Sequence, residues 1–349
     1  MKRHFLHCIL FAALLTAMPL LPAYLLKPQT AAGAETPLVF TEYTESAETG
    51  TITETTAELS TTEPETVESV TYHVLDTASG EILEVPLREY LIGAVGAEMP
   101  VSFEMEALKA QAVAAHTYAE RQCLLSPHRP ELNGADFSND PAVYQAYLTE
   151  NEQRERWGTH YAAYYARLAE AVDAVLHEVL VYEDEPIIAA FHAMSSGRTE
   201  SAANVWGSEV AYLCSVESDA DRTAPEYEKT AVFTAEEVQE RLTAAHTGLT
   251  INGDPSGWFG EPTATEAGTV LQMPVGNGIF TGQELRTLFE LRSAAFTVSY
   301  ADGSFTFTTY GYGHDVGMSQ YGANALAAEG QSYQEILAYY YPNTNLIQR

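Results

Sequence analysis

The alternation of apolar and polar residues after Val70 predicts a hairpin followed by a helix. The segments "VTYHVL" and "EILEVPL" flank the turn sequence "DTASG", a pattern typical of two short antiparallel strands. Pro86 then suits a first helical turn, and "LREYLIGAVGAE" repeats apolar residues every three to four positions. We expect this helix to end before Pro100, because the residue before a proline disfavours helical geometry.

A second helix is expected to begin near Ser102, whose hydroxyl suits an N-cap. In "FEMEALKAQAVAAHTYAERQCLL" one face is marked by Met105, Leu108, Ala112, Ala115 and Ala119. The many alanines indicate close packing against a neighbour, which we take to be the preceding helix. The corner between the two helices, from Glu98 to Phe103, is then a place where side chains can face a cleft.

The apolar pattern and turn residues of the remaining sequence predict further helices and strands in mixed order. We expect a helix near 150 to 177, strands at "EVLVYED" and "PIIAAFHAM", a helical patch at 235 to 245, a helix at "TGQELRTLFEL", a hairpin turning at 301 to 303, and a helix closed by Gly330. Helices and antiparallel hairpins without a repeating βαβ order indicate the α+β class.

The amino terminus predicts a membrane segment and a spacer. The run from Phe5 to Leu26 has no formal charge and could cross a hydrocarbon layer roughly 30 Å thick, while small residues at 32 to 34 leave room for a cleaved signal peptide instead. Thr, Glu and Ser then dominate, a composition that cannot bury enough apolar surface to fold. We therefore expect an anchor or signal at 1–34, a disordered acidic spacer at 35–69, and a folded region at 70–349.

Charge and cysteine content narrow the classes of partner. The formal net charge of −31 makes nucleic acid a poor partner, and anionic lipid beyond the anchor likewise. Cys8 lies in the apolar run, so only Cys123 and Cys214 remain for a disulfide, and the sequence leaves their pairing open. No clustered His/Cys spacing indicates a metal site, and we expect no cofactor.

Glu98 stands where the local pattern asks for an apolar or neutral residue. The carboxyl end of a helix disfavours an anion and apolar neighbours would desolvate it, and both effects raise the pKa of a carboxyl group. A partly protonated glutamic acid is what a general acid needs near neutral pH. The ordinary alternative is a surface glutamate satisfied by water or by Arg88.

Two further segments carry polar residues suited to a site. In "FHAMSSGRTE", His192 with Ser195 or Ser196 could form a nucleophile pair, although loop groups that bind a ligand or each other fit the spacing as well. Arg198 could hold an anion or pair with Glu200 or Glu209. In "YGYGHDVGMSQYG" glycines surround His314 and permit close backbone approach to a ligand or a plain structural turn.

Four long motifs in fixed order resemble the SpoIID/LytB family of peptidoglycan enzymes. They are "VPLREYLIGAVGAEMPVSFEMEALKAQAVAAHTYA", "FHAMSSGRTESAANVWG", "GQELRTLFELRSAAFTV" and "GHDVGMSQYGANALAAEGQSYQEILAYYYPNT". The resemblance covers roughly residues 85 to 345. It implies a crescent-shaped mixed fold with a glycan groove, and lytic transglycosylase activity on peptidoglycan strands stripped of stem peptides.

The resemblance also implies roles for individual residues. The family's catalytic glutamate falls on Glu98, which would protonate the bond between N-acetylmuramic acid and N-acetylglucosamine and leave a 1,6-anhydro end. The expected substrate-binding residues are Lys109, Gln111, His116, His192, Ser195, Ser196, Arg198, His314 and Gln320. Stripped strands carry a muramyl lactate carboxylate, and Lys109, Arg198 or protonated His314 are the candidates to meet it.

The chain departs from the family pattern at several positions. His116 stands where many relatives have arginine, and Asp315 replaces the usual glycine after His314. Some members bind zinc through a Cys, His, Cys arrangement, but Ser138, Val143 and Tyr144 occupy those places, so no zinc is expected there.

The expected setting is the outer face of the membrane, at the wall or sporulation septum, beside a wall amidase and other engulfment proteins. Two rival functions remain: a non-catalytic activator or scaffold of a wall amidase, and a Ser–His hydrolase.

Overall fold

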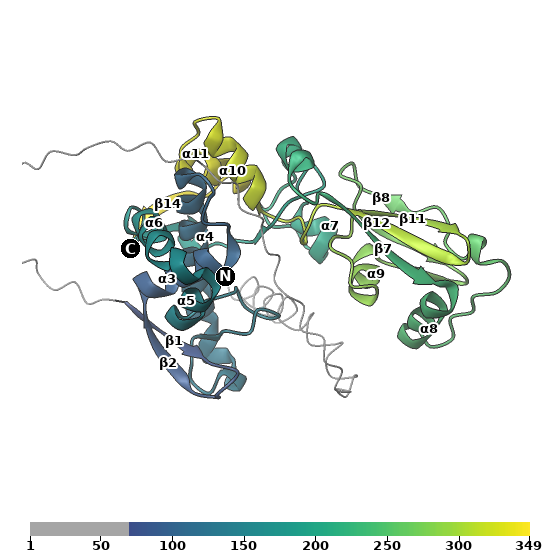
Figure 1. Cartoon of the computed structure of the whole chain (residues 1–349), viewed down its shortest axis with the longest axis horizontal. Helices are drawn as coiled ribbons and strands as arrows, with labels where there is room; N and C mark the ends of the chain where they lie inside the picture. The colour runs from purple at the N-terminus through teal and green to yellow at the C-terminus, as the bar shows by residue number, and fades with distance from the viewer. Residues whose placement is uncertain (1–69) are drawn as a thin grey trace, which may run out of the picture. The chain divides into compact units, whose positions relative to one another are not determined.

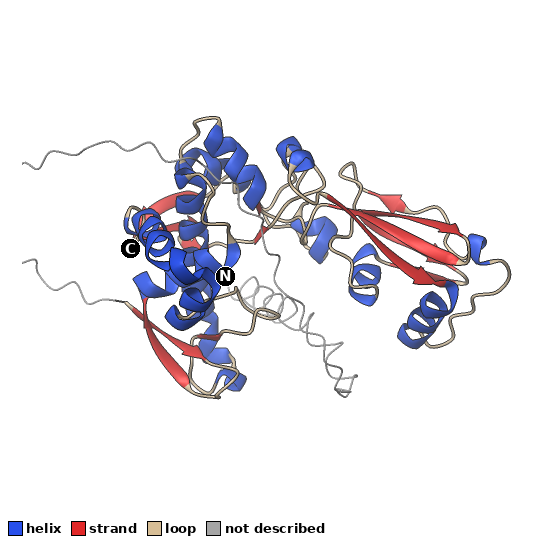
Figure 2. Ribbon diagram, in the orientation of Figure 1, coloured by secondary structure: helices blue, strands red, loops and turns tan. Residues whose placement is uncertain are grey.

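A computed structural model of the chain describes residues 70–349. The predicted anchor or signal segment (1–34) and acidic spacer (35–69) lie outside the described residues. Helices and small, mostly antiparallel sheets share the described part of the chain, so the predicted α+β class is confirmed (Figure 2). Within residues 70–349, no helix combines the length and the apolar content needed to cross a membrane.

The predicted amino-terminal hairpin and helix are both present. Strand β1 (Thr71–Leu75) pairs antiparallel with β2 (Ile82–Pro86), and β3 (Phe137–Ser138) adds to β1 in parallel. Helix α3 (Leu87–Glu98) follows at once, with Pro86 as its N-cap rather than in its first turn. The helix ends as predicted, because Met99 before Pro100 is extended.

Helix α4 (Met105–Leu125) lies at the centre of the larger hydrophobic core (Figure 1). It packs against α3, against strand β4 (Glu178–Tyr182) and against three later helices, α6 (Tyr161–Asp173), α10 (Gln320–Ala328) and α11 (Tyr333–Tyr340). Four of the five residues that mark the predicted face are buried, Met105 being the exception, but burial extends further than predicted, since Ala107 to Ala119 is buried on nearly all sides. Short alanine side chains allow this close approach from several directions.

Two predicted boundaries differ from the structure. The N-cap of α4 is Glu104, while Ser102 lies exposed in the preceding turn, because Pro100 and Phe103 close a turn of their own through a backbone hydrogen bond of 3.0 Å. The helix expected near 150 to 177 is broken into α5 (Glu150–Trp157), η3 (Gly158–His160) and α6. Gly158 has φ 50, which interrupts the helical backbone.

The segment expected as one strand at "PIIAAFHAM" forms only short pieces. Strand β5 (Glu185–Pro186) pairs with β4, whose other neighbour is β14 (Asn345–Gln348). Strand β6 (Phe191–His192) pairs in parallel with β13 (Met318–Ser319), directly before α10. This pairing brings the "FHAMSSGRTE" and "GHDVGMSQYG" segments together.

A second hydrophobic core forms around an antiparallel sheet (Figure 1). Strand β12 (Ser304–Tyr310) lies between β11 (Phe296–Ala301) and β7 (Glu228–Thr234), and the predicted turn at 301 to 303 joins β11 to β12. The other elements of this part are α8 (Ala235–Ala245), η5 (Pro255–Gly257), β8 (Thr263–Ala264), β9 (Val270–Val275), β10 (Gly278–Phe280) and α9 (Gly282–Leu288).

Short helices complete the described chain. They are η1 (Ser126–His128), η2 (Pro130–Leu132), α7 (Ala202–Trp206) and η4 (Asp219–Thr223). Of these, η4 is important below, because it contacts α10 and contains a buried carboxylate.

We predict that Phe307→Ala destabilises the protein by about 3–5 kcal/mol, because its fully buried ring stacks on Phe289 at 4.7 Å and truncation leaves a cavity. Urea unfolding followed by circular dichroism measures this. The control is Val232→Ala on the neighbouring strand, where the side chain is 61% exposed and the effect should stay within about 0.5 kcal/mol. Equal losses in the two variants would contradict this description of the core.

Candidate active site

Glu98 is the last residue of α3 and lies partly buried at the corner that leads to α4. The residues before it, from Tyr90 to Gly96, are buried. Arg88, the cation that an ordinary surface role would use, donates instead to the carboxylate of Asp173 at 2.6 Å and 2.9 Å. The Glu98 carboxyl is therefore not neutralised by the arginine nearest to it on the same helix.

Three other segments supply the polar surroundings of Glu98. The backbone N–H of Ala146 donates to Oε1 of Glu98 at 3.0 Å. The side chain of Gln320, at the start of α10, also hydrogen-bonds the carboxylate. Arg156 on α5 provides a positive charge that acts on Glu98. Chain segments far apart in sequence thus converge on one carboxyl group.

Burial is the largest influence on the pKa of Glu98, and it raises that pKa above the ordinary value of 4.5. The hydrogen bonds from Ala146 and Gln320 and the charge of Arg156 act in the opposite direction, without cancelling it. The sequence-based expectation of a carboxyl group that holds its proton more tightly than usual matches this environment. Such a group can donate a proton near neutral pH.

Two glutamine side chains continue the network away from Glu98. Nε2 of Gln320 donates to Oε1 of Gln111 at 3.4 Å, and both side chains are buried. Gln111 keeps a buried Nε2 for which the described residues offer no hydrogen-bond partner. Gln111 and Gln320 were both expected at the substrate, and Gln111 is thus linked to Glu98 through Gln320.

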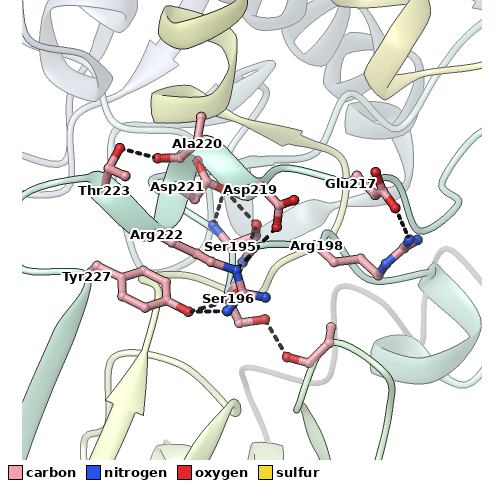
Figure 3. A network of polar contacts seen from close by, with 12 residues as sticks. Ser195, Ser196, Arg198, Glu217, Asp219, Ala220, Asp221, Arg222, Thr223 and Tyr227 are labelled. Atoms are coloured by element: carbon pink, nitrogen blue, oxygen red, sulfur yellow. Dashed lines mark hydrogen bonds and ion pairs between the residues drawn. The ribbon is translucent and has the colours of Figure 1, made fainter.

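A second polar cluster has a buried carboxylate at its centre, Asp221 (Figure 3). Oδ2 of Asp221 accepts from the hydroxyl and the backbone N–H of Ser195 at 2.6 Å and 2.8 Å, and Oδ1 accepts from the hydroxyl of Ser319 at 2.7 Å. Ser319 is also the N-cap of α10. Asp221 therefore joins the "FHAMSSGRTE" loop to the helix that begins with Gln320.

Sequence reasoning missed Asp221, and also Arg156 and Ala146. Asp221 stands in "ESDADRT", where several acidic residues look alike and only the fold shows which one is buried. Arg156 lies in a strongly polar helix with no apolar stripe to set it apart. Ala146 acts through its backbone, which no side-chain pattern can reveal.

The two histidines expected at the site lie side by side, with ring centroids 5.7 Å apart. Nδ1 of His192 lies 3.2 Å from the carbonyl oxygen of Val316, while its buried Nε2 has no partner among the described residues. Burial lowers the pKa of His192 to about 3 and that of His314 to about 4, with Arg286 adding to the effect on His314. Both rings are therefore neutral at pH 7.

Asp315, which stands where the family pattern has glycine, adopts a left-handed backbone with φ 65. Glycine accepts this conformation without strain, as the glycine implied here by the family resemblance would, and aspartate is among the side chains that tolerate it best. Burial raises the pKa of the Asp315 carboxyl, partly offset by Arg286.

The remaining candidates make contacts elsewhere. Lys109 forms an ion pair with Glu106 at 2.6 Å, and buried His116 points its Nδ1 to the carbonyl oxygen of Glu178 at 3.1 Å. The expected pairing of Arg198 with Glu200 or Glu209 is wrong, because its partner is Glu217 at 3.0 Å. Glu200 instead accepts hydrogen bonds from Thr265 and Asn204.

Ser196, Cys123 and Cys214 take no part in the contacts around Glu98. The hydroxyl of Ser196 donates to the carbonyl oxygen of Ala267 at 2.7 Å. Cys123 and Cys214 are free thiols. Within residues 70–349 no three His, Cys, Asp or Glu side chains are grouped in a way that suits a metal ion.

Comparison with known proteins agrees with the pattern of motifs. Residues 76–182 match the family model described as "Stage II sporulation protein", SpoIID. The chain is 37% identical over 278 residues to "Stage II sporulation protein D" of Bacillus subtilis, covering 79% of each chain. The chain belongs to the SpoIID family. A second SpoIID relative, from Bacillus amyloliquefaciens, is also 37% identical and covers 81% of each chain.

A more distant relative of this SpoIID chain is named for a different role. "Amidase enhancer" of Bacillus subtilis is 27% identical over 316 residues, which is 73% of this chain but 40% of that protein. SpoIID membership rests on the sporulation relatives, which match along most of their own length.

The raised pKa of Glu98 predicts a pH-dependent cost in stability. The native state holds this proton at pH values where the unfolded chain has released it, so the free energy of unfolding falls as pH rises above about 4.5. Glu98→Gln removes that titration. The stability of the variant relative to the parent should therefore increase between about pH 4 and about pH 8 in urea unfolding. A difference that stays constant over this range would show that Glu98 titrates normally.

Proposed function

We propose that this SpoIID protein is a lytic transglycosylase that cleaves the bond between N-acetylmuramic acid and N-acetylglucosamine in peptidoglycan strands without stem peptides. The names of its relatives support a role in sporulation, and the family's motifs support the cell wall as its place of action. The observation that carries the proposal is the desolvated Glu98 carboxyl, held by Ala146 and Gln320.

In the proposed reaction Glu98 acts twice. The protonated carboxyl group first donates its proton to the glycosidic oxygen as the bond to C1 of the muramic sugar breaks. The resulting carboxylate then takes the proton from the C6 hydroxyl of the same sugar as that oxygen bonds to C1. The products are a 1,6-anhydro end and a free hydroxyl on the departing sugar, and Glu98 regains its proton.

The groups around Glu98 favour attack by the sugar's own C6 hydroxyl over hydrolysis by water. A glycoside hydrolase ordinarily uses two carboxyl groups, the second to activate water or attack the sugar. Among the described residues, the groups that shift the pKa of Glu98 are the backbone N–H of Ala146, the amide of Gln320 and the charge of Arg156, and none of them is a carboxyl group. A single carboxyl group suffices when the substrate supplies its own nucleophile.

A second candidate function is activation of a wall amidase without catalysis. The relative named "Amidase enhancer" favours it, and under it Glu98 would be structural. The third rival, a Ser–His hydrolase, finds little support, because the Ser195 hydroxyl donates to Asp221 rather than to His192.

The proposed setting follows from the amino-terminal sequence and the family. We place the folded region outside the cytoplasmic membrane, held by the segment at 1–34, at the wall or the sporulation septum. An amidase that removes stem peptides would act before this enzyme, and other engulfment proteins would act beside it.

Glu98→Gln should lower the release of anhydro-muramyl products from stripped glycan by at least roughly 100-fold, since the amide can neither donate nor accept the required proton. Mass spectrometry of the digest by the full chain measures this. The control is Glu89→Gln on the same helix, where the carboxylate bonds Tyr165 and activity should persist. Anhydro products formed equally by parent and Glu98→Gln would end the proposal, and acceleration of an amidase by both would favour the rival.

Gln320→Met should raise the pKa of Glu98 further, because the variant loses a donor that stabilises the carboxylate. The limb of the pH–rate profile that needs protonated Glu98 should then move to higher pH, while the fold is preserved by a side chain of similar volume. An unchanged limb with reduced rate would mean that Gln320 acts on the substrate instead.

A further inference from the structure

A pocket of about 260 Å³ opens beside the Asp221 cluster, away from the residues assigned to proton transfer. Its lining includes Ser196, Arg222, Tyr227, Phe296 and Tyr310. Figure 3 shows the side chains of Arg222 and Tyr227 lying against Ser196, while Arg198 extends toward Glu217 instead. The pocket combines one cation with aromatic rings.

We propose that this pocket binds a carboxylate-bearing sugar of the glycan, with Arg222 as the group that meets the carboxylate. The inference rests on the proposed function for the identity of the glycan. It replaces the three cations considered from sequence with a residue that the sequence did not single out.

Arg222 is held in place by its neighbours. Its Nη1 donates to the Tyr227 hydroxyl at 3.4 Å, and that hydroxyl donates to the carbonyl oxygen of Ser196 at 2.8 Å. The guanidinium lies so close to Gly197 that a Cβ there would come within 2.3 Å of Nε. Gly197, with φ 107, therefore leaves space for the guanidinium to lie against the backbone.

The present ion pair of Arg222 is weak enough to yield to a ligand. Nε lies 3.3 Å from Asp219, whose side chain is 78% exposed, and exposed pairs contribute little. These contacts use Nε and Nη1 and leave Nη2 for another acceptor. A carboxylate can accept two parallel hydrogen bonds from a guanidinium. Asp219 accepts from Nε of Arg222 alone.

The three cations considered from sequence are less suited to the task. Lys109 is engaged by Glu106 at 2.6 Å, and Arg198, which extends toward Glu217, does not line the pocket. His314 carries no charge at neutral pH, because its pKa is about 4. On a chain with a net charge of −31, an anionic sugar needs a local cation to offset repulsion.

The aromatic lining suits the rest of a sugar ring. Tyr227 and Tyr310 have ring centroids 6.0 Å apart at an interplanar angle of 45°, and Phe296 lines the same pocket. Such side chains present apolar faces with polar tips. A sugar can pack its C–H face on these rings while its carboxylate reaches Arg222.

The pocket and Glu98 belong to one hydrogen-bonded framework. Asp221 precedes Arg222 and accepts from Ser319, which precedes Gln320, and Gln320 bonds Glu98. These contacts connect the segment that carries Arg222 to the segment that carries Gln320.

The test measures binding in the Glu98→Gln background, so that it can be read whether or not the chain cleaves glycan. Arg222→Gln should raise the Kd for stripped glycan by about 10-fold or more, which is the loss of affinity typical of removing a charge-assisted hydrogen bond. Binding of a chitin oligosaccharide, which has no carboxylate, should change less than about 2-fold. Asp219→Asn, which removes the competing carboxylate, should tighten binding of stripped glycan.

The matched control is Arg154→Gln, since Arg154 is 56% exposed and paired with Glu150 much as Arg222 is paired with Asp219. It should leave both affinities unchanged. Equal Kd values for Arg222→Gln and its parent, or an equal loss for chitin, would overturn the proposal. So would an Arg222-dependent affinity for stem-peptide glycan as high as for stripped glycan, because the carboxylate would then belong to the peptide. If the parent chain forms no anhydro products, or forms them equally with Glu98→Gln, the proposed function fails, and these binding measurements still decide whether Arg222 meets the carboxylate.

Discussion

Desolvation of one carboxyl group is the constraint around which the described part of this SpoIID chain is arranged. Glu98 ends α3 among buried residues; a loop and the start of α10 supply hydrogen bonds, and α5 supplies a positive charge that acts on the carboxyl group. Each of these contacts stabilises the charged form, while burial opposes it. The balance leaves the pKa above its ordinary value, which suits the proton donor that we propose Glu98 to be.

Rigid support for this balance comes from hydrogen bonds between segments that are distant in the chain. Asp221 holds Ser195 and Ser319 with one carboxylate, and Ser319 in turn caps α10. The position of Gln320 is therefore fixed by a group on η4 rather than by α10 alone. Gln320 stands at the start of a capped helix, which limits how far its side-chain amide can move. A displaced amide would change the pKa of Glu98.

The sequence predicted local structure well where a pattern was short and strongly punctuated. The first hairpin, α3 up to Glu98 and the turn at 301 to 303 are set by turn residues and by Pro100. It failed where tertiary contacts decide, as for α4, whose alanines are buried on nearly all sides, and for the segment around β6, which is mostly irregular. Glu98 became a candidate because it departs from its local apolar pattern and because the family resemblance implies its role. Asp221, Arg156 and Arg222 obey theirs, so only the fold distinguishes them from ordinary polar residues.

The two unpaired cysteines of residues 70–349 bear on how the protein can be handled. Burial raises the pKa of the Cys123 thiol, so little thiolate forms there at neutral pH and its reaction with disulfides is slow. No covalent cross-link between Cys123 and Cys214 holds the described fold together. Noncovalent contacts, above all the two hydrophobic cores, hold this part of the chain together, so a reducing agent present during unfolding experiments breaks no cross-link between these two cysteines.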